Sequence, residues 1–327
     1  MKLPSLDPSG WFVYSSLDAL DKGIVSRELF GIKYIAFKNS SNDILVTIDS
    51  CPHRGYPLSK GLISNDNLQC SYHGWKFNQN GDCIQVPGTQ NCPKFKLKLI
   101  TYHSHEGYLW ICLGEKQSLP SFELMKNSIE SSLLFNINAH HFLIFENTFD
   151  RMHIPTVHKN FVTKTSKTVK YRIKCHQDKL EITNLSEGKQ VGFLSSLFGS
   201  NSDIAIERYI YPGIIQLEFL QKTKTKLLFT IFLSPVNKDK TQLEVKIQYC
   251  KSHLLLSPIL TPLLRWFTKR ITQQDIKYLE NQHSKLRDSN LSFSHTAQDY
   301  VYKYLEEIVT TKGKAKLTDK SIELKLV

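Results

Sequence analysis

Two short stretches of the sequence decide the amino-terminal fold: CPHRG at residues 51–55 and CSYHGW at residues 70–75. Each stretch combines a cysteine, a histidine and a glycine, and a glycine allows the backbone to approach a sulfur atom closely. Two thiolates and two imidazoles could hold a zinc ion. They could equally hold a two-iron, two-sulfur cluster in which two histidines replace two cysteines. The short apolar runs and turn residues around both stretches predict an all-β domain with the ligands at hairpin tips, which favours the cluster.

The two stretches resemble the cluster-binding signature of Rieske proteins. The resemblance implies that Cys51 and Cys70 bind one iron of the [2Fe-2S] cluster and that His53 and His73 bind the other. The neighbouring segments GWFVYSS, GDCIQVPG and GYLWICLG resemble the Rieske domain of ring-hydroxylating oxygenases. The amino-terminal domain is therefore expected to be an electron-transfer domain.

Tyr56 and Tyr72 stand where Rieske proteins of respiratory chains carry two cysteines that join the cluster loops. Without those cysteines no loop disulfide can form, so the cluster is expected to be of the oxygenase or ferredoxin kind. The chain has seven cysteines, an odd number, and its first residues do not resemble a secretory signal. We therefore expect reduced, buried or metal-bound cysteines and a cytoplasmic location.

A second group of candidate ligands lies in FENTFDRMHIPTVH, residues 145–158. On one helix, Asn147, Asp150 and His153 would share a face because they are three residues apart. A proline would then end the helix, so that His158 could lie beside His153. Two close imidazoles and a distant carboxylate form the facial triad that leaves coordination positions open on non-haem ferrous iron. Taken alone, such a histidine pair is weak evidence for a metal site.

Behind a Rieske domain, this stretch resembles the NxxDxxHxxxxH motif of Rieske non-haem iron oxygenases. The resemblance extends from about Trp11 to about Gln282. It implies that His153 and His158 bind a mononuclear iron, and that a carboxylate from a helix late in the chain is the third ligand.

Asp275 is the candidate for this third ligand. The inward stripe of the helix predicted there consists of Ile271, Asp275, Leu279 and Gln282. An ionised aspartate on a mostly apolar stripe is costly to bury unless it is paired or bound to a metal. The rival carboxylates are Glu280, Asp288 and Asp299.

The resemblance also suggests roles for Asp150 and Asn147 in catalysis. Family members form head-to-tail trimers, which implies that Asp150 links His73 of one chain to His153 of the next. A carboxylate between two imidazoles would make two charge-assisted hydrogen bonds and couple proton position to redox state. The alternatives for Asp150 are a salt bridge to Arg151 and a helix cap.

The second half of the chain has a different pattern. Alternating polar and apolar residues between 169 and 250 predict long antiparallel strands, and helical patterns follow. Together they predict an α+β chain: an all-β Rieske domain followed by a catalytic domain with a twisted antiparallel sheet flanked by helices, of the helix-grip type. The expected domains are residues 1–118, 119–311 and a basic tail at 312–327, with the boundary within residues 117–122.

The chain carries 42 Lys and Arg against 30 Asp and Glu, a net charge of +12. Lysines alternate with other residues along the predicted strands, which indicates a solvated sheet face and no nucleic-acid partner. A basic surface would suit an acidic protein partner. The apolar segment 253–267 is too short to cross a membrane and contains two prolines. We expect a core helix or the wall of a substrate tunnel there, and a shallow contact with lipid is the alternative.

These observations predict the terminal oxygenase component of a multicomponent Rieske oxygenase. No nucleotide-binding glycine motif follows a strand, so electrons from NAD(P)H would need a separate reductase, with or without a ferredoxin. The chain length resembles that of homotrimeric monooxygenases and demethylases, which implies that O2 is used to hydroxylate or demethylate a hydrophobic organic substrate. The alternative is a non-catalytic electron carrier or redox sensor whose second domain binds a ligand.

Overall fold

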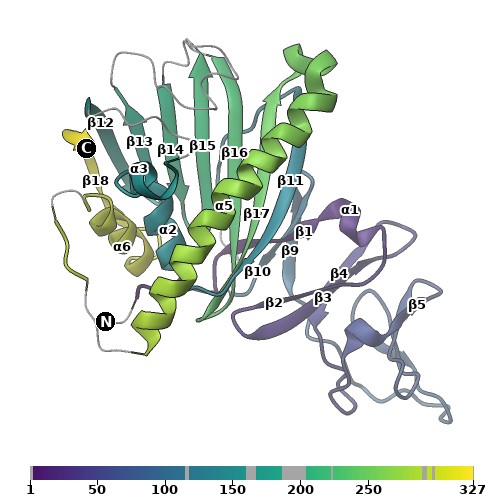
Figure 1. Cartoon of the computed structure of the whole chain (residues 1–327). Helices are drawn as coiled ribbons and strands as arrows, with labels where there is room; N and C mark the ends of the chain where they lie inside the picture. The colour runs from purple at the N-terminus through teal and green to yellow at the C-terminus, as the bar shows by residue number, and fades with distance from the viewer. Residues whose placement is uncertain are drawn as a thin grey trace. The chain divides into compact units, whose positions relative to one another are not determined.

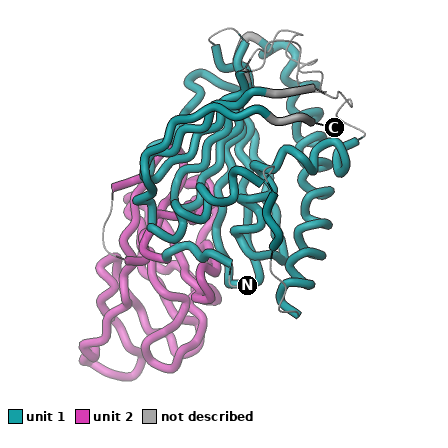
Figure 2. The backbone as a smooth tube through the Cα atoms, turned by 90° about the vertical axis from the view of Figure 1, so that its left-hand side faces the viewer, with its two compact units in different colours: residues 1–7, 120–327 teal, residues 8–119 magenta. Residues whose placement is uncertain are grey.

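The computed structural model describes residues 3–114, 118–159, 167–185, 204–221, 224–288, 293–296 and 299–326. The chain divides into two compact units (Figure 2). One unit comprises Pro8–Leu119, and the other comprises Met1–Asp7 together with Pro120–Val327. Gln117, where the expected boundary segment begins, lies outside the described residues.

The smaller unit consists of three small antiparallel sheets with the strand orders β1-β10-β9, β2-β3-β4 and β5-β6-β7-β8. Its strands are β1 (Trp11–Ser16), β2 (Val25–Leu29), β3 (Ile32–Lys38), β4 (Ile44–Ile48), β5 (Leu62–Ser64), β6 (Asn67–Gln69), β7 (Lys76–Phe77), β8 (Cys83–Gln85), β9 (Thr101–His105) and β10 (Tyr108–Cys112). Its short helices are α1 (Leu17–Leu20) and η1 (Leu58–Lys60). The predicted all-β architecture of this part is confirmed.

Strand β3 shows why this unit folds around two hydrophobic clusters. Successive side chains of a strand point to opposite faces. Accordingly, Ile35 and Phe37 belong to one cluster, while Tyr34 and Ala36 belong to the other. The first cluster also contains Cys51, so the packed core anchors the start of the first Cys/His loop.

The larger unit is built on an eight-stranded antiparallel sheet with the order β11-β17-β16-β15-β14-β13-β12-β18 (Figure 1). Its strands are β11 (Ser128–Ile137), β12 (Lys167–Gln177), β13 (Lys179–Asn184), β14 (Ile204–Ile210), β15 (Ile214–Gln221), β16 (Lys224–Asn237), β17 (Lys240–Cys250) and β18 (Ala315–Leu326). The alternating pattern from residue 169 onward predicted the inner strands, and these are confirmed. It did not predict β11 at one edge.

The expected basic tail is wrong, because Ala315–Leu326 is the edge strand β18. It pairs with β12 along its length, for example through Tyr171 and Ile322. The chain reverses just before it at Lys312 and Gly313, both in the left-handed region with φ of 56° and 77°. An edge strand tolerates many charged side chains because one of its sides remains in water. The lysine-rich composition was therefore compatible with a strand.

The helices of the larger unit lie on one face of the sheet (Figure 1). They are α2 (His141–Phe149), α3 (Ile154–Val157), η2 (Lys251–Leu256), α5 (Ser257–Arg287) and α6 (Tyr302–Thr310). Helix α5 packs Leu260 and Leu264 into a cluster with Phe229 of β16. Helix α2 packs Phe145 against Tyr209 of β14, with ring centroids 4.7 Å apart. The predicted helical segments after Cys250 are thus confirmed.

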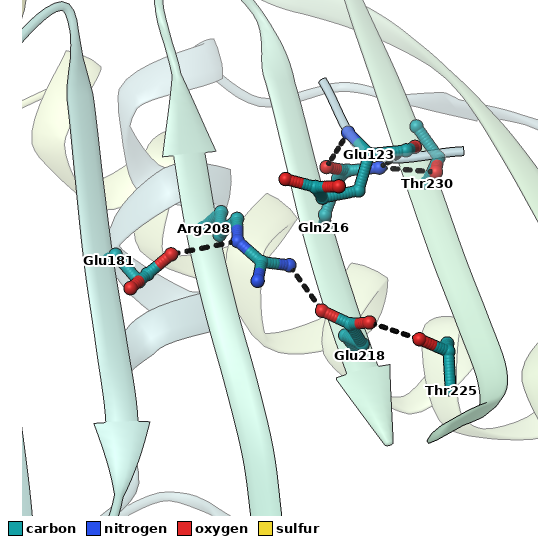
Figure 3. A network of polar contacts seen from close by, with 7 residues as sticks. All are labelled: Glu123, Glu181, Arg208, Gln216, Glu218, Thr225 and Thr230. Atoms are coloured by element: carbon teal, nitrogen blue, oxygen red, sulfur yellow. Dashed lines mark hydrogen bonds and ion pairs between the residues drawn. The ribbon is translucent and has the colours of Figure 1, made fainter. Parts of the chain in front are cut away.

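The opposite face of the same sheet carries a buried polar network (Figure 3). Arg208 directly precedes Tyr209 on β14. Because successive side chains of a strand point to opposite faces and Tyr209 packs on α2, Arg208 points away from the helices. Its guanidinium donates hydrogen bonds to Glu181 at 2.9 Å and to Glu218 at 2.6 Å. Gln216 donates to the carbonyl of Glu123 at 2.8 Å, which ties the segment before β11 to the sheet. Arg208, Gln216 and Glu218 are all buried, and the hydrogen bonds of Arg208 connect β14 to both of its neighbouring strands.

Candidate functional site

The two Cys/His loops of the smaller unit share one backbone arrangement. In the first loop the amide of Cys51 donates to the carbonyl of Tyr56 at 2.9 Å, and the amide of Gly55 donates to the carbonyl of Cys51 at 2.8 Å. The loop that begins at Cys70 repeats both bonds between its equivalent residues, each at 2.9 Å. Two tight turns of the same kind therefore present both cysteines.

Glycine is required at the fifth residue of each loop. Gly55 and Gly74 have φ of 69° and 72°, the left-handed region that other residues rarely adopt. A Cβ atom on Gly74 would also lie only 2.9 Å from Cγ of Pro87. The glycines that were noted in the sequence are thus needed for the turns that direct the ligands.

The two candidate cluster histidines lie side by side, and the two candidate cysteines are buried. The rings of His53 and His73 lie 4.7 Å apart, and Trp75 stacks on His53 with centroids 4.5 Å apart. Cys51 and Cys70 are only 3% and 1% exposed. Burial raises the pKa of the Cys51 thiol to about 11, and the neighbouring thiol of Cys70 adds to the rise. Paired buried thiols of this kind suit a positively charged metal centre, which stabilises their thiolate forms.

Tyr56 and Tyr72 bring the two Cys/His loops into contact. Their rings lie 5.2 Å apart, and Tyr72 also packs on His73 with centroids 3.8 Å apart. All seven cysteines are free, as the sequence predicted for the loops. Aromatic contact, and no covalent bond, joins the two loops.

The second group of candidate ligands converges on one point. One ligand atom from each of His153, His158 and Asp275 lies within 4.8 Å of the others. The Oδ1 atom of Asp275 is 3.1 Å from Nε2 of His158 and 3.6 Å from Nε2 of His153. This buried oxygen receives no hydrogen bond of good geometry from the described residues. Two imidazoles and an unsatisfied carboxylate oxygen around one point form the donor set that suits ferrous iron.

The local structure around His153 differs from the expected single helix. Helix α2 ends at Phe149, and Asp150 is its extended C-cap residue. The Asp150 carboxylate accepts a hydrogen bond from the amide of Met152 at 2.7 Å, which competes with continuation of the helix. His153 instead lies at the start of the short helix α3, and His158 lies at its end. The one-face argument for Asn147, Asp150 and His153 was therefore wrong, although the histidines do meet.

Comparison with known proteins assigns both halves of the chain. Residues 10–96 match the family described as the Rieske [2Fe-2S] domain. Residues 137–302, half of the chain, match the family described as the vanillate O-demethylase oxygenase C-terminal domain. The chain belongs to the Rieske non-haem iron oxygenase family. The metal groups that this family membership implies are a [2Fe-2S] cluster and a mononuclear non-haem iron, and His153, His158 and Asp275 form a group that could hold the latter.

Individual relatives of this Rieske oxygenase chain are distant. Chlorophyllide a oxygenase of Arabidopsis thaliana is 23% identical and matches 84% of this chain and 52% of its own length. Protein TIC 55 of the same plant is 25% identical and matches 84% of this chain and 53% of its own length. The chain thus spans about half the length of these relatives. A crystal structure of dicamba monooxygenase bound to dicamba shares the fold, with a TM-score of 0.82 and 16% identity over 94% of this chain and 99% of that chain.

The rival carboxylates of this Rieske oxygenase chain make other contacts. Glu280 accepts hydrogen bonds from the backbone and side-chain nitrogens of Asn138, both at 2.9 Å. Asp288 pairs with its neighbour Arg287 at 3.2 Å, and Asp299 accepts from the amide of Thr296 at 2.6 Å. Asp275 is the carboxylate that lies beside both histidines.

Asp150 does not form the salt bridge to Arg151 that was one alternative for it. Arg151 instead pairs with Glu207 of β14. The carboxylate of Asp150 has its Oδ2 atom 3.4 Å from Nδ1 of His153. Burial would raise the pKa of Asp150, but hydrogen bonds from His153 and from the Met152 amide outweigh burial and lower it. Asp150 is therefore held as an anion next to a candidate iron ligand.

Asn147 lies in the last turn of α2 and is half-buried. Its backbone carbonyl accepts a hydrogen bond from the amide of Asp150 at 3.3 Å. Asn147 thus contributes to the turn that positions Asp150, and a catalytic role for its side chain stays a prediction.

Gln274 is a further residue at the site that sequence reasoning missed. Its Oε1 atom lies 3.0 Å from Nδ1 of His158. A ring nitrogen that donates to an acceptor fixes the tautomer of the imidazole and turns its other nitrogen toward the metal. The sequence offered no signal for this role, because the adjacent Gln273 is identical in type but exposed.

Replacing Gln274 by Met should weaken binding of ferrous iron at the mononuclear site by about 10–100-fold, because His158 loses its acceptor. Gln274→Glu should largely preserve affinity, since a carboxylate also accepts the bond. The measurement is titration of Fe(II) against a competing chelator, with the cluster spectrum monitored in parallel. Gln273→Met is the matched control and should have no effect. Equal weakening in both Met variants would contradict a positioning role for Gln274.

Glu146 is an ionisable group on α2, four residues before Asp150. Burial raises its pKa from 4.5 to about 7, and the carboxylates of Asp150 and Asp299 add to the rise. Like charges repel, so the ionised form of Glu146 is disfavoured beside these two carboxylates. Glu146 therefore holds a proton more tightly than an exposed glutamate does.

A raised pKa in the folded state means that stability falls as pH rises from about 4.5 through about 7, because the unfolded chain releases the proton first. Glu146→Gln carries no such proton. Its melting temperature should therefore rise relative to the natural chain between about pH 5 and about pH 8. Thermal unfolding across this pH range measures the difference, with exposed Glu306→Gln as the control. A difference that does not change with pH would contradict the raised pKa.

Proposed function

We propose that the chain is the terminal oxygenase component of a multicomponent Rieske oxygenase. The convergence of His153, His158 and Asp275 carries this proposal, because an electron carrier would not need a second metal site. The same chain holds two Cys/His loops of matched geometry in its other unit. An electron-storing centre and a dioxygen site in one chain are the two parts that such an oxygenase requires.

The proposed ligands follow from this geometry. Cys51 and Cys70 would bind one iron of the cluster, and His53 and His73 would bind the other. His153, His158 and Asp275 would hold the mononuclear ferrous iron, which when bound supplies open coordination positions for dioxygen activation. The proposed metal ligands of the chain are therefore Cys51, His53, Cys70, His73, His153, His158 and Asp275.

We further propose that Asp150 links the two metal centres between subunits of a homotrimer. Its Oδ2 atom faces His153, and its side chain is 36% exposed, which leaves room for a second imidazole. His73 of a neighbouring chain would supply that imidazole. A carboxylate that accepts from two ring N–H groups holds both rings in place and makes the position of a proton depend on redox state.

The electrons would come from NAD(P)H through a separate reductase, with or without a ferredoxin. The net charge of +12 favours an acidic partner, whose association should weaken as salt is added. The substrate would be a small hydrophobic organic molecule that is hydroxylated or demethylated. Support comes from relatives whose names include chlorophyllide a oxygenase and a 4beta-methylsterol monooxygenase of Methylococcus capsulatus.

Metal analysis of the anaerobically purified chain tests this proposal. About three iron atoms and about two acid-labile sulfides per chain are expected. Oxygen consumption is then measured with a reductase and a panel of sterols, porphyrin-derived pigments and methoxylated aromatics. About two iron atoms per chain without substrate-dependent oxygen uptake would favour the electron carrier. A colourless zinc protein would exclude both functions.

A further inference from the structure

The 3-10 helix η2 leads into the start of α5, which is the upper end of that helix in Figure 1. Large apolar side chains of this stretch are exposed. They are Leu254, Leu255, Leu256, Ile259 and Trp266, which are 58%, 95%, 57%, 72% and 55% exposed. Large apolar side chains that gather on one exposed surface indicate a contact with a membrane or another molecule. We call this set the α5 apolar tip.

The same part of α5 is firmly packed on its other side. Leu260 and Leu264 are 7% and 1% exposed and lie in the hydrophobic cluster on β16 and β17. Ile259, Pro262 and Trp266 are three and four residues apart, so they share the face that these buried leucines leave to solvent. The expected core helix in residues 253–267 is thus confirmed for one side only. Packing of the inner side fixes the apolar tip in its outward orientation.

The stretch of sequence that contains the apolar tip carries charges of one sign. No acidic residue occurs between Glu244 and Asp275, whereas this interval contains Lys246, Lys251, Arg265, Lys269 and Arg270. Four of these basic residues, Lys251, Arg265, Lys269 and Arg270, are exposed. Exposed leucine, isoleucine and tryptophan with a basic rim are the features of a surface that lies in the headgroup region of an anionic bilayer.

A second copy of this chain is a poorer match for the same surface. It also carries a net charge of +12, so it does not complement a rim of basic residues. Anionic lipid headgroups complement both the charge and, through their acyl chains, the apolar side chains.

We propose that the α5 apolar tip docks the protein on anionic membranes, with its leucines, Ile259 and Trp266 inserted at the lipid interface. The chain would lie on the bilayer. None of the helices in the described part of the chain combines the length and apolar character that a membrane crossing requires. Asp275 follows Ile259 by sixteen residues on the same helix, about 24 Å along its axis. Docking at the start of α5 would therefore leave Asp275 about 24 Å along the helix from Ile259.

Flotation of the iron-loaded full chain with vesicles tests this proposal. Vesicles of phosphatidylcholine and phosphatidylglycerol, mixed at roughly 7:3, should bind the protein. Vesicles of phosphatidylcholine alone should bind it weakly, and salt should reduce the binding. The double variant Leu255→Glu/Ile259→Glu should lower the partition coefficient at least about tenfold. Lys269→Gln and Arg270→Gln should each lower it roughly fivefold on the anionic vesicles.

Leu317→Glu is the matched control, because Leu317 is 71% exposed on β18, away from this helix. It should bind vesicles as the natural chain does. Circular dichroism and iron content should show that all variants remain folded and loaded. Failure of the natural chain to bind anionic vesicles would overturn the proposal, and so would an equal loss in Leu317→Glu. A loss of oligomeric mass in Leu255→Glu/Ile259→Glu with unchanged vesicle binding would instead identify the apolar tip as an interface between chains.

Discussion

Replacing Asp275 by Ala should reduce the iron content from about three atoms to about two per chain, while the cluster spectrum remains. The remaining His153 and His158 supply only neutral nitrogens, which bind ferrous iron weakly without the carboxylate. Substrate-dependent oxygen consumption should fall by at least about a hundredfold. Mutation of a residue that merely supports a metal ligand can already cause a loss of this size, and Asp275 is itself a proposed ligand. Iron analysis and the visible spectrum of the cluster are measured on the same sample.

Glu280→Ala provides the control for this experiment, because it removes a carboxylate from the same helix. Glu280 binds Asn138 at 2.9 Å and lies beside neither histidine. Its variant should keep about three iron atoms per chain. A full complement of iron in Asp275→Ala would show that another residue completes the mononuclear site, and the proposed triad would then be wrong.

The substitution Asp150→Asn should also have a large effect on turnover. It should lower turnover without changing metal binding, and so separate the two. Asparagine keeps the shape of the side chain and an oxygen for the Met152 amide, which lies 2.7 Å from the carboxylate. It loses the charge and presents an N–H group to one of the imidazoles. We expect unchanged iron content and trimer mass, with turnover lowered by about a hundredfold.

The step that fails can be measured directly in Asp150→Asn. The reduced chain is mixed with oxygen and substrate, and reoxidation of the cluster is followed by its absorbance in a stopped-flow instrument. Slow reoxidation is expected, because in the proposed trimer the electron passes between two centres that Asp150 links. Asp288→Asn changes an exposed carboxylate paired with Arg287 at 3.2 Å and should reoxidise normally. Normal turnover in Asp150→Asn would refute the link.

The cluster loops could be predicted from sequence because their geometry is local. A cysteine, a histidine and a glycine within six residues define each turn, and the positive φ of Gly55 and Gly74 admits glycine far more readily than other residues. The candidate role of Asp275 could likewise be predicted from its position on the inward helical stripe, because a buried aspartate on an apolar face needs a partner. The stripe was placed slightly wrongly at its end, because His283 is buried and Gln282 is exposed.

Other features depended on contacts between distant segments. The strand at Ala315–Leu326 forms because the free edge of β12, more than a hundred residues earlier in the sequence, pairs with it. Gln273 and Gln274 are adjacent residues of the same type, and of the two it is Gln274 whose side-chain oxygen lies 3.0 Å from Nδ1 of His158. No periodicity distinguishes such residues.

By itself, the sequence determined the kind of chemistry. Few metal centres are compatible with two Cys/His turns, a histidine pair and one aspartate, Asp275, on a mostly apolar helical stripe. The tertiary structure alone decided which atoms meet, which residue orients His158, and which side of α5 faces water. The physical reason is the distance along the chain over which each interaction acts. Turn geometry and burial costs act over a few neighbouring residues, whereas the position of a helix on a sheet is set by the packing of strands that lie a hundred residues away.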